Sequence, residues 1–459
     1  MTRREFNLCA GGTAVAVPLY AQGFEDMPWK GPATVKRVYL AVQRPTWPRP
    51  DLDVNREKAS LESNLAELER RHAADIRFSG GELVRTAEDA EAWVKGLGDA
   101  DAVLIVDLTS GTGGMLRPFR EVDIPILLYS RPYSGWSYVD VTAWVQAGKK
   151  ADLIVTSEVR DLDPYMRVFH TIRHLRRSKV LAITPSSGAR QVADGFTRQF
   201  GTAITFLGYQ DLKAAFDGAE VEKAEKAAAE FTRAARRVLE PSRDEIRDAL
   251  RFYLGVLDLL RREKANAMTI DCLGGFRRGE LPAYPCVAWS KLNDQGLYGV
   301  CEGDLHSTMT QMLVTSFSGK PGFVSDPVFD TGRGEIIHAH CVAATALQGV
   351  GGPGSPYIIR SHMEDNKCVS MQVLAPAKGV VTVAKFTDPR KLVISTGEVT
   401  GNVDSGQGCR TQIRTRVAGA RKMLAGFSGG LHRVVFYGDY VGALERMSRL
   451  MGFQMVREM

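Results

Sequence analysis

Short apolar runs alternate with amphipathic segments over the first part of the chain, and this alternation restricts the fold more than any other feature of the sequence. The runs that we interpret as buried strands occupy residues 35–42, 101–108, 124–130 and 151–157. Residues 55–73, between the first two runs, have the periodicity of an amphipathic helix. Buried runs separated by helices are typical of a parallel sheet covered on both faces. We therefore predict a Rossmann-like α/β domain over residues 30–175.

A second unit of the same kind follows. Residues 178–196 read as a strand that enters a helix through a Ser/Gly turn, 221–265 as two amphipathic helices, and 266–273 as a buried strand. We predict a second Rossmann-like α/β domain over residues 176–320. The Gly-x-Gly-x-x-Gly fingerprint of dinucleotide-binding domains is absent from QRPTWPRPD, the segment after the first strand, where it belongs.

The pattern changes after about residue 320. Short strand-like segments separated by turn residues, among them EIIHAHCVA, KGVVTVAKF and KLVISTGEV, indicate an antiparallel sheet or barrel. A chain of 459 residues is too long for one hydrophobic core. The predicted fold class is therefore α/β, with two Rossmann-like parallel α/β domains followed by a C-terminal antiparallel β-barrel-like domain over residues 321–459.

The first residues, MTRREFNLCAGGTAVAVPLYAQG, place Arg3 and Arg4 ahead of a weakly apolar stretch. This arrangement resembles a twin-arginine export signal, which we assign to residues 1–24. The hypothesis makes the mature protein periplasmic or exported; if the two arginines are incidental, the protein is cytoplasmic. No segment has the ~20 consecutive apolar residues of a membrane-spanning helix, so we expect no membrane association of the mature form.

Charge and cysteine spacing exclude further classes. The 59 basic and 53 acidic residues give a net charge of +6. Because no long basic run accompanies this mild excess, we expect no nucleic-acid partner. The 7 cysteines are widely spaced without a Cys-x-x-Cys motif, which argues against a disulfide framework or a zinc ribbon. We interpret most of them as buried small apolar side chains.

The segment YGVCEGDLHSTMTQML joins a strand-like run to a predicted helix. Asp304 is placed to cap that helix, and we interpret it as structural. Glu302 lies at the carboxyl end of a predicted central strand, the edge where open α/β sheets place ligands. His306 in the first helical turn and His362 in a polar loop are weaker candidates. Glu302 is therefore the first candidate functional residue.

Asp326 lies on one predicted strand and His338 and His340 lie on the next, with the turn DTGRG between them. If Thr331 pairs with Glu335, Asp326 faces His340, and a tighter register makes Asp326 face His338. A third possibility is an odd register, in which the numbers of two paired residues add up to an odd value. Both histidines then lie on the opposite face of the sheet from Asp326. A carboxylate and imidazoles on one face suit a divalent metal, and a hydrogen-bonded barrel histidine is the alternative for each imidazole.

His432 opens a predicted strand within GFSGGLHRVVFYGD. Gly429 and Gly430 just before it permit a close approach of the backbone. Taken alone, one histidine at the mouth of a strand is a weak indication of a ligand.

The order and spacing of five segments over roughly residues 260–440 resemble the L-fucose isomerase and L-arabinose isomerase superfamily. The segments are CEGDLHSTMTQML, SGKPGFVSDPVFD, HAHC, PAKGVVTVAKF and SGGLHRVVFYGD. In that family a Glu after a strand, a second acid further along and a late His bind a manganese ion. The resemblance implies Mn²⁺ held by Glu302, Asp326 and His432, with His340 as an additional ligand by analogy with arabinose isomerases.

The resemblance also implies a small-molecule sugar as substrate and a homo-oligomer, either a trimer or a hexamer. Arg433 departs from the family's Gly-Gly-x-His-His pattern, because it stands where the second His would be. Cys301 and Cys341, which adjoin two of the implied ligands, are expected to pack behind the site.

The chemistry that the resemblance implies is aldose–ketose isomerisation through an enediol. Glu302 and Asp326 would be the catalytic acid and base as well as metal ligands, since a proton must move between adjacent carbons. Two other classes stay open. One is an exported sugar-binding or catalytically inactive relative; the other is a different Glu/Asp/His metal enzyme, a hydrolase or a lyase.

Overall fold

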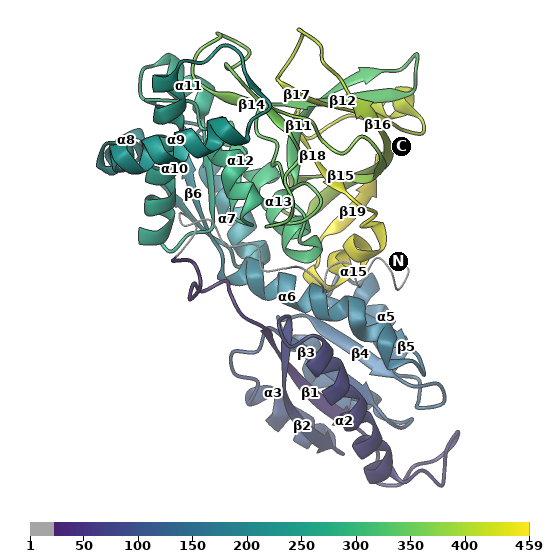
Figure 1. Cartoon of the computed structure of the whole chain (residues 1–459). Coiled ribbons are helices and arrows are strands. Elements are labelled where there is room, and N and C mark those ends of the chain that lie inside the picture. The colour runs from purple at the N-terminus through teal and green to yellow at the C-terminus, as the bar shows by residue number, and fades with distance from the viewer. Residues whose placement is uncertain (1–22, 459) are drawn as a thin grey trace.

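The structure is a computed structural model that describes residues 23–458. Arg3 and Arg4, on which the export hypothesis rests, lie outside the described residues. Within the described range, none of the helices combines the length and the apolar character needed to cross a membrane. Figure 1 shows the N-terminal α/β unit below, a second group of helices at the upper left, and the C-terminal strands at the upper right.

A five-stranded parallel sheet forms the N-terminal unit. Its strands in spatial order are β2 (Ile76–Val84), β1 (Ala33–Leu40), β3 (Ala102–Asp107), β4 (Ile126–Ser130) and β5 (Ala151–Val155). Its helices are α2 (Val54–Arg71), α3 (Ala87–Lys95), α4 (Gly113–Leu116), α5 (Ser137–Gln146) and α6 (Asp163–Arg177). Leu104 of β3 belongs to the core that contains α2 and α6, and Ile105 to the core that contains α3 and α5. The predicted parallel sheet with both faces covered is confirmed.

The second unit is a four-stranded parallel sheet. Its strands in spatial order are β10 (Tyr298–Cys301), β9 (Ala267–Ile270), β6 (Lys179–Ile183) and β7 (Ala203–Phe206). Its helices are α7 (Ala189–Phe200), α8 (Tyr209–Gly218), α9 (Val221–Ala234), α10 (Arg243–Arg262), α11 (Cys272–Arg277), α12 (Cys286–Asp294) and α13 (Leu305–Ser318). Ile183 pairs with Ile270, and Ile270 with Cys301. Three strands therefore end at one edge, and Glu302 follows the outermost of them.

The C-terminal strands form a closed six-stranded antiparallel barrel, as predicted. Its strands in order are β15 (Gly379–Asp388), β18 (Arg433–Tyr437), β11 (Phe323–Asp330), β12 (Glu335–His340), β17 (Thr411–Arg416) and β16 (Lys391–Asn402), which closes on β15. Strand β19 (Gln454–Arg457) adds to β16 in parallel. The helices here are α14 (Ala420–Ala425) and α15 (Val441–Met451). A small sheet joins β14 (Ser370–Val373), β13 (Tyr357–Arg360) and β8 (Arg237–Val238).

Helix α13 lies between the second parallel sheet and the barrel, and it contacts α6, β9, β15 and β18 (Figure 1). Met309, Met312 and Leu313 are fully buried on it, which agrees with their predicted role as core. The backbone N–H of Phe386 on β15 donates to Thr310 Oγ1 at 2.8 Å. Because α13 begins just after Glu302, the barrel meets the carboxyl edge of the second sheet at this residue.

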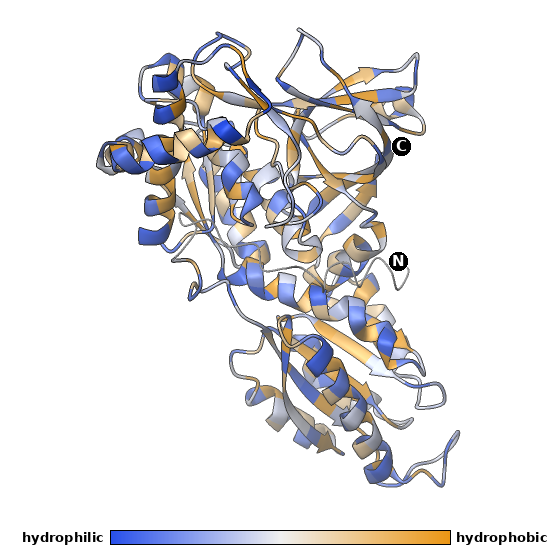
Figure 2. Ribbon diagram, viewed as in Figure 1, coloured by the Kyte–Doolittle hydropathy of each residue, from blue (hydrophilic) through white to orange (hydrophobic). Residues whose placement is uncertain are grey.

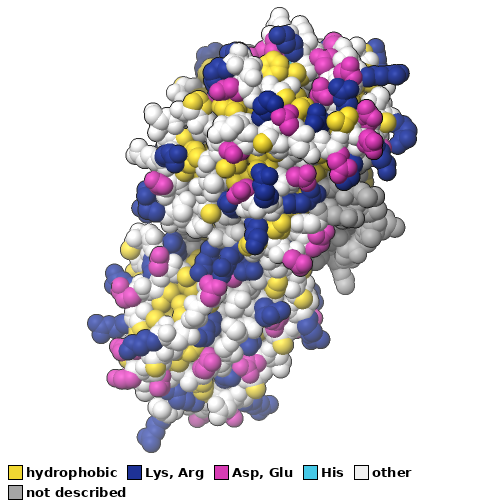
Figure 3. Space-filling model, turned by 90° about the vertical axis from the view of Figure 1, so that its left-hand side faces the viewer, with side chains coloured by type: hydrophobic (Ala, Val, Ile, Leu, Met, Phe, Trp, Pro, Cys, Tyr) yellow, Lys and Arg dark blue, Asp and Glu magenta, His cyan; other side chains and the backbone are white. Residues whose placement is uncertain are grey.

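Burial follows the hydrophobic pattern of the sequence. In Figure 2 the parallel strands are largely orange, whereas α2 and α9 carry blue, hydrophilic sides. On the face shown in Figure 3, basic and acidic side chains are interspersed. This mixture agrees with the small net charge of +6.

Candidate metal centre

Glu302 sits in a strained turn between β10 and α13. Its φ is 64°, and Gly303 has a φ of 65°. A left-handed conformation costs an L-residue with a side chain roughly 1–2 kcal/mol, so it persists only where the surroundings fix it. A Cβ on residue 303 would lie 3.0 Å from Thr184 Cβ. The turn therefore presents the Glu302 carboxylate at the end of β10, which is an edge strand and not the central strand that the sequence predicted.

Asp304 does more than cap a helix. The predicted cap is present, because Ser307 N–H donates to Asp304 Oδ1 at 3.0 Å. The other oxygen, Oδ2, accepts from His432 Nδ1 at 2.9 Å and from Lys385 Nζ at 2.6 Å. Its interpretation as a purely structural residue was thus incomplete. The carboxylate links α13 to two barrel strands.

The hairpin of β11 and β12 takes the odd register. Asp330 pairs with Glu335 and Asp326 with Ala339, so neither register that would make Asp326 face a histidine occurs. His338 points to the opposite face of the sheet from Asp326. There it contacts Ser325 Oγ and Thr415 Oγ1, each at 3.1 Å, and is buried. His338 is therefore a hydrogen-bonded barrel histidine.

His340 reaches the site although the register of β12 places it on the opposite face of the sheet from Asp326. It is the last residue of β12, and its Nε2 lies 3.6 Å from Glu302 Oε1. The backbone N–H of Cys341 donates to His340 Nδ1 at 2.9 Å. A nitrogen that accepts a hydrogen bond carries no proton, so the proton of the neutral ring resides on Nε2, which faces Glu302.

Asp326 and His432 meet through a second strand pairing. Ser325 of β11 pairs with Arg433 of β18, which places Asp326 and His432 side by side on the same face. Asp326 Oδ1 lies 3.5 Å from His432 Nε2, and the same nitrogen lies 3.4 Å from Glu302 Oε2. The structure thus brings all four sequence-predicted site residues together. Their role as metal ligands stays a prediction.

The segment before β18 is held by close packing and by Arg433. Gly429 has a φ of 77°, and a Cβ there would lie 2.2 Å from Thr387 Cγ2. Arg433 is buried and binds both carboxylate oxygens of Glu458, at 3.0 and 2.6 Å. It also donates to the carbonyls of Ser428, Gly430 and His432. Arg433 therefore fixes the backbone that carries His432.

Three buried atoms of the cluster lack hydrogen-bond partners. They are Asp326 Oδ1, His340 Nε2 and His432 Nε2. Buried polar atoms are nearly always satisfied, so three unsatisfied atoms in one cluster call for a ligand. One donor atom each from Glu302, His340 and His432 lie within 4.8 Å of one another. The donor set of carboxylates and imidazole fits a divalent cation such as Mn²⁺.

The pKa values of Glu302 and Asp326 are shifted in opposite directions. The imidazoles of His340 and His432 beside it hold the pKa of Glu302 well below its usual range. Burial raises the pKa of Asp326, and the neighbouring charge of Glu302 adds to that effect. Burial alone would raise the pKa of Asp304 too, but His432 and Lys385 hold it well below its ordinary value. Glu302 and Asp304 are therefore the ionised acids of the site.

Two residues that sequence reasoning did not select belong to the site: Asp304 as the acceptor for His432, and Lys385. No local pattern marks Lys385, which follows an apolar strand-like run. His306, a weaker candidate, packs against Phe196 and lies 3.9 Å from Asp304. His362 lies among cysteines rather than beside Glu302.

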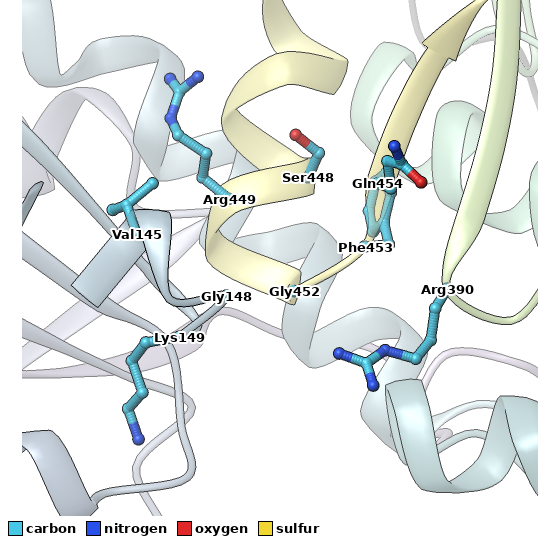
Figure 4. Close-up of a pocket in the computed structure, with 9 residues that line it drawn as sticks. All are labelled: Val145, Gly148, Lys149, Arg390, Ser448, Arg449, Gly452, Phe453 and Gln454. Carbon is cyan, nitrogen blue, oxygen red and sulfur yellow. The ribbon is translucent and has the colours of Figure 1, made fainter. Parts of the chain in front are cut away.

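A separate cavity of about 410 Å³ opens between the N-terminal unit and the end of α15 (Figure 4). Lys149, Arg390, Arg449 and Phe453 are among its lining residues. Arg449 is paired with Asp152 at 2.8 Å. None of the four predicted site residues lines this cavity.

Comparison with known proteins does not identify a family. No protein-family model matches the chain, and the search of curated proteins found no match either.

Proposed function

We propose that this protein is a divalent-metal-dependent aldose–ketose isomerase of the L-fucose and L-arabinose isomerase type. The observation that carries the proposal is the position of His432 Nε2 between the two acids, 3.4 Å from Glu302 Oε2 and 3.5 Å from Asp326 Oδ1. This nitrogen and Asp326 Oδ1 are both buried and without hydrogen-bond partners. The residue order and spacing that resemble the isomerase superfamily supply the reaction class.

Glu302, Asp326 and His432 are the residues that would hold the ion, most simply Mn²⁺. Because Asp304 accepts the Nδ1 proton of His432, the ring presents the lone pair of Nε2 to the cluster. A carboxylate behind a metal-binding histidine fixes its tautomer and raises its basicity. This arrangement supports His432 as a ligand.

His340 has the opposite tautomer. Its Nδ1 accepts from the Cys341 amide, which leaves the ring proton on Nε2, 3.6 Å from Glu302 Oε1. We therefore assign His340 as the donor that orients the Glu302 carboxylate, in place of the ligand role that the family resemblance implied.

Isomerisation of an open-chain aldose moves a proton between C1 and C2. The ion would supply positive charge beside O1 and O2, which makes the C2 proton easier to abstract. The carboxylates of Glu302 and Asp326 are the groups that would take the proton from one carbon and return it to the other. The Glu302 side chain is 36% exposed while His340 and His432 are buried, so an approaching sugar meets this carboxylate first.

The test is a screen of the purified full-length chain, loaded with Mn²⁺, against pentose and hexose aldoses, with ketose formation as the readout. We expect turnover of at least one aldose, loss of turnover on chelation, and loss in the Glu302→Gln variant. Ketose formation that survives in Glu302→Gln would contradict the assigned role of this residue. Sugar binding without turnover by metal-loaded protein would contradict the isomerase proposal and favour the sugar-binding alternative.

Export and assembly belong to the same proposal. We expect the twin-arginine segment to direct the protein to the periplasm, and we expect a trimer or a hexamer. Fractionation of cells and the molar mass in solution check these two predictions.

A further inference from the structure

Five cysteines that are far apart in the sequence converge beside the carboxylate and imidazole cluster. This thiol cluster consists of Cys272, Cys286, Cys301, Cys341 and Cys409. The sequence interpretation of isolated buried thiols is therefore incomplete, although Cys301 and Cys341 do pack behind the site as predicted. The thiols are all free, and four of them are buried.

Cys341 is the centre of the thiol cluster. Its Sγ lies 3.3 Å from Cys286 Sγ, and its thiol also contacts those of Cys301 and Cys409. The 3.3 Å separation is well above the ~2.05 Å of a disulfide bond. Cys286 begins α12, whereas Cys341 directly follows β12, so the contact joins the second α/β unit to the barrel.

His362 completes a compact donor set. One donor atom each from Cys286, Cys341 and His362 lie within 4.8 Å of one another. His362 is 4% exposed, and its Nδ1 has no hydrogen-bond partner. Its ring stacks on Tyr284 at 4.1 Å, with the rings inclined by 20°. A buried imidazole that is held rigidly beside two thiols, with an unsatisfied nitrogen, has the features of a ligand that awaits its ion.

We propose that Cys286, Cys341 and His362 bind a second metal ion, Zn²⁺, in a site separate from the carboxylate centre. Thiolates and imidazole are the ligands that zinc prefers, and the carboxylate set beside them suits a harder ion. Two thiolates balance the charge of a divalent ion, which a buried site requires. Cys409, at the partly exposed edge, is the thiol placed to supply a fourth ligand.

The geometry needs only a small adjustment. A tetrahedral ion ~2.3 Å from two sulfurs holds them ~3.8 Å apart. Cys286 and Cys341, now 3.3 Å apart, would separate by about half an ångström. Metal binding would then cross-link the start of α12, the end of β12 and the loop after β13. Because His340 precedes Cys341, this cross-link would also restrict the backbone beside the carboxylate centre.

The test uses Co²⁺ as a spectroscopic probe for zinc, on the full-length chain under reducing conditions. We expect thiolate-to-cobalt charge-transfer absorption that is displaced by Zn²⁺, and a melting temperature that Zn²⁺ raises by several degrees. Cys286→Ser and His362→Gln should each weaken Co²⁺ binding at this site at least tenfold. Cys368→Ser is the matched control, because Cys368 is a free, partly buried cysteine outside the thiol cluster.

The carboxylate variant Glu302→Gln separates the two sites. It should keep the charge-transfer absorption even if it loses Mn²⁺ and ketose formation, so the two proposals can fail independently. The zinc proposal is overturned if wild-type protein shows no charge-transfer band, or if Cys286→Ser and His362→Gln, folded by circular dichroism, retain the full band. A Cys286–Cys341 disulfide as the stable form in place of bound metal would also overturn it.

Discussion

At the scale of single residues, Asp304 shows how one carboxylate can cap a helix and also bind a histidine of the candidate metal centre. Oδ1 caps α13 through Ser307, and Oδ2 accepts from His432 and Lys385. The cap was predictable from the sequence, because an acid between a strand and a helix is a common N-cap. The second role was not, since His432 arrives from a strand far along the chain.

The substitution Asp304→Asn separates the two roles. Asparagine caps helices as well as aspartate does, so α13 should persist. The amide would donate to His432 Nδ1 and move the ring proton to Nε2, which blocks ligation. We expect Mn²⁺ affinity to fall about 10–100-fold, measured by titration calorimetry. Lys385→Met is the control, since it should lower stability while His432 keeps its acceptor. Unchanged Mn²⁺ affinity in Asp304→Asn would contradict the proposal that Asp304 orients His432.

The two histidines at the centre should respond differently to the same change. His432→Gln removes a proposed ligand, and we expect Mn²⁺ affinity to drop by about a hundredfold or more. His340→Gln keeps an N–H donor for Glu302, so affinity should stay within about tenfold of wild type. Equal losses in the two variants, from the same calorimetric titrations, would show that His340 is a ligand after all.

At the scale of elements, strand register decided that His338 lies on the opposite face from Asp326 and that His432 lies beside it. The turn between Asp330 and Glu335 is compatible with several registers, and the sequence alone could not choose among them. The odd register occurs, and it sends His338 into a hydrogen-bonded network. The meeting of Asp326 with His432 depends on the pairing of β11 with β18, which only the closed barrel reveals.

The end of β3 gives a prediction about pH. Asp107 is buried, and Thr112 before α4 donates to its Oδ1 at 2.9 Å. Burial raises the pKa of Asp107 to about 7, although hydrogen bonds from Ser137 and Thr112 oppose the shift. An unfolded aspartate has a pKa near ~3.9, so between about pH 4 and pH 7 the folded state binds more protons. Stability from this group therefore falls as pH rises through that window.

We expect Asp107→Asn to remove this contribution. At pH 8 the variant should have a free energy of unfolding higher than wild type by a few kcal/mol, at ~1.4 kcal/mol per pKa unit, and near pH 4 the gain should vanish. Urea denaturation at both pH values measures the difference. Asp101→Asn is the control, and we expect it to lower the free energy of unfolding. Asp101 is buried, paired with Arg176 at 3.5 Å, and accepts from the Thr34 amide. A gain from Asp107→Asn that is the same at pH 4 and pH 8 would contradict the assignment.

At the scale of the whole molecule, the fold class was predictable because buried parallel strands have long apolar runs. The parallel strands that the sequence did not reveal are the ones that break this rule. Strand β2 contains Gly80, Gly81 and Glu82 and lies at a sheet edge, and β7 is short and only partly buried. The thiol cluster escaped prediction because its members come from separate elements, although Cys301 and Cys341 each adjoin a predicted site residue.

The central claim is that Glu302, Asp326 and His432 form one divalent-metal centre between the second parallel sheet and the barrel. Its most direct test is an anomalous difference map from crystals grown with Mn²⁺ and measured at the manganese absorption edge. The account predicts a peak about 2.0–2.6 Å from a carboxylate oxygen of each acid and from His432 Nε2, with His340 Nε2 outside that shell. Manganese-loaded crystals with no peak among these three residues, or with a peak held by other side chains, would contradict it.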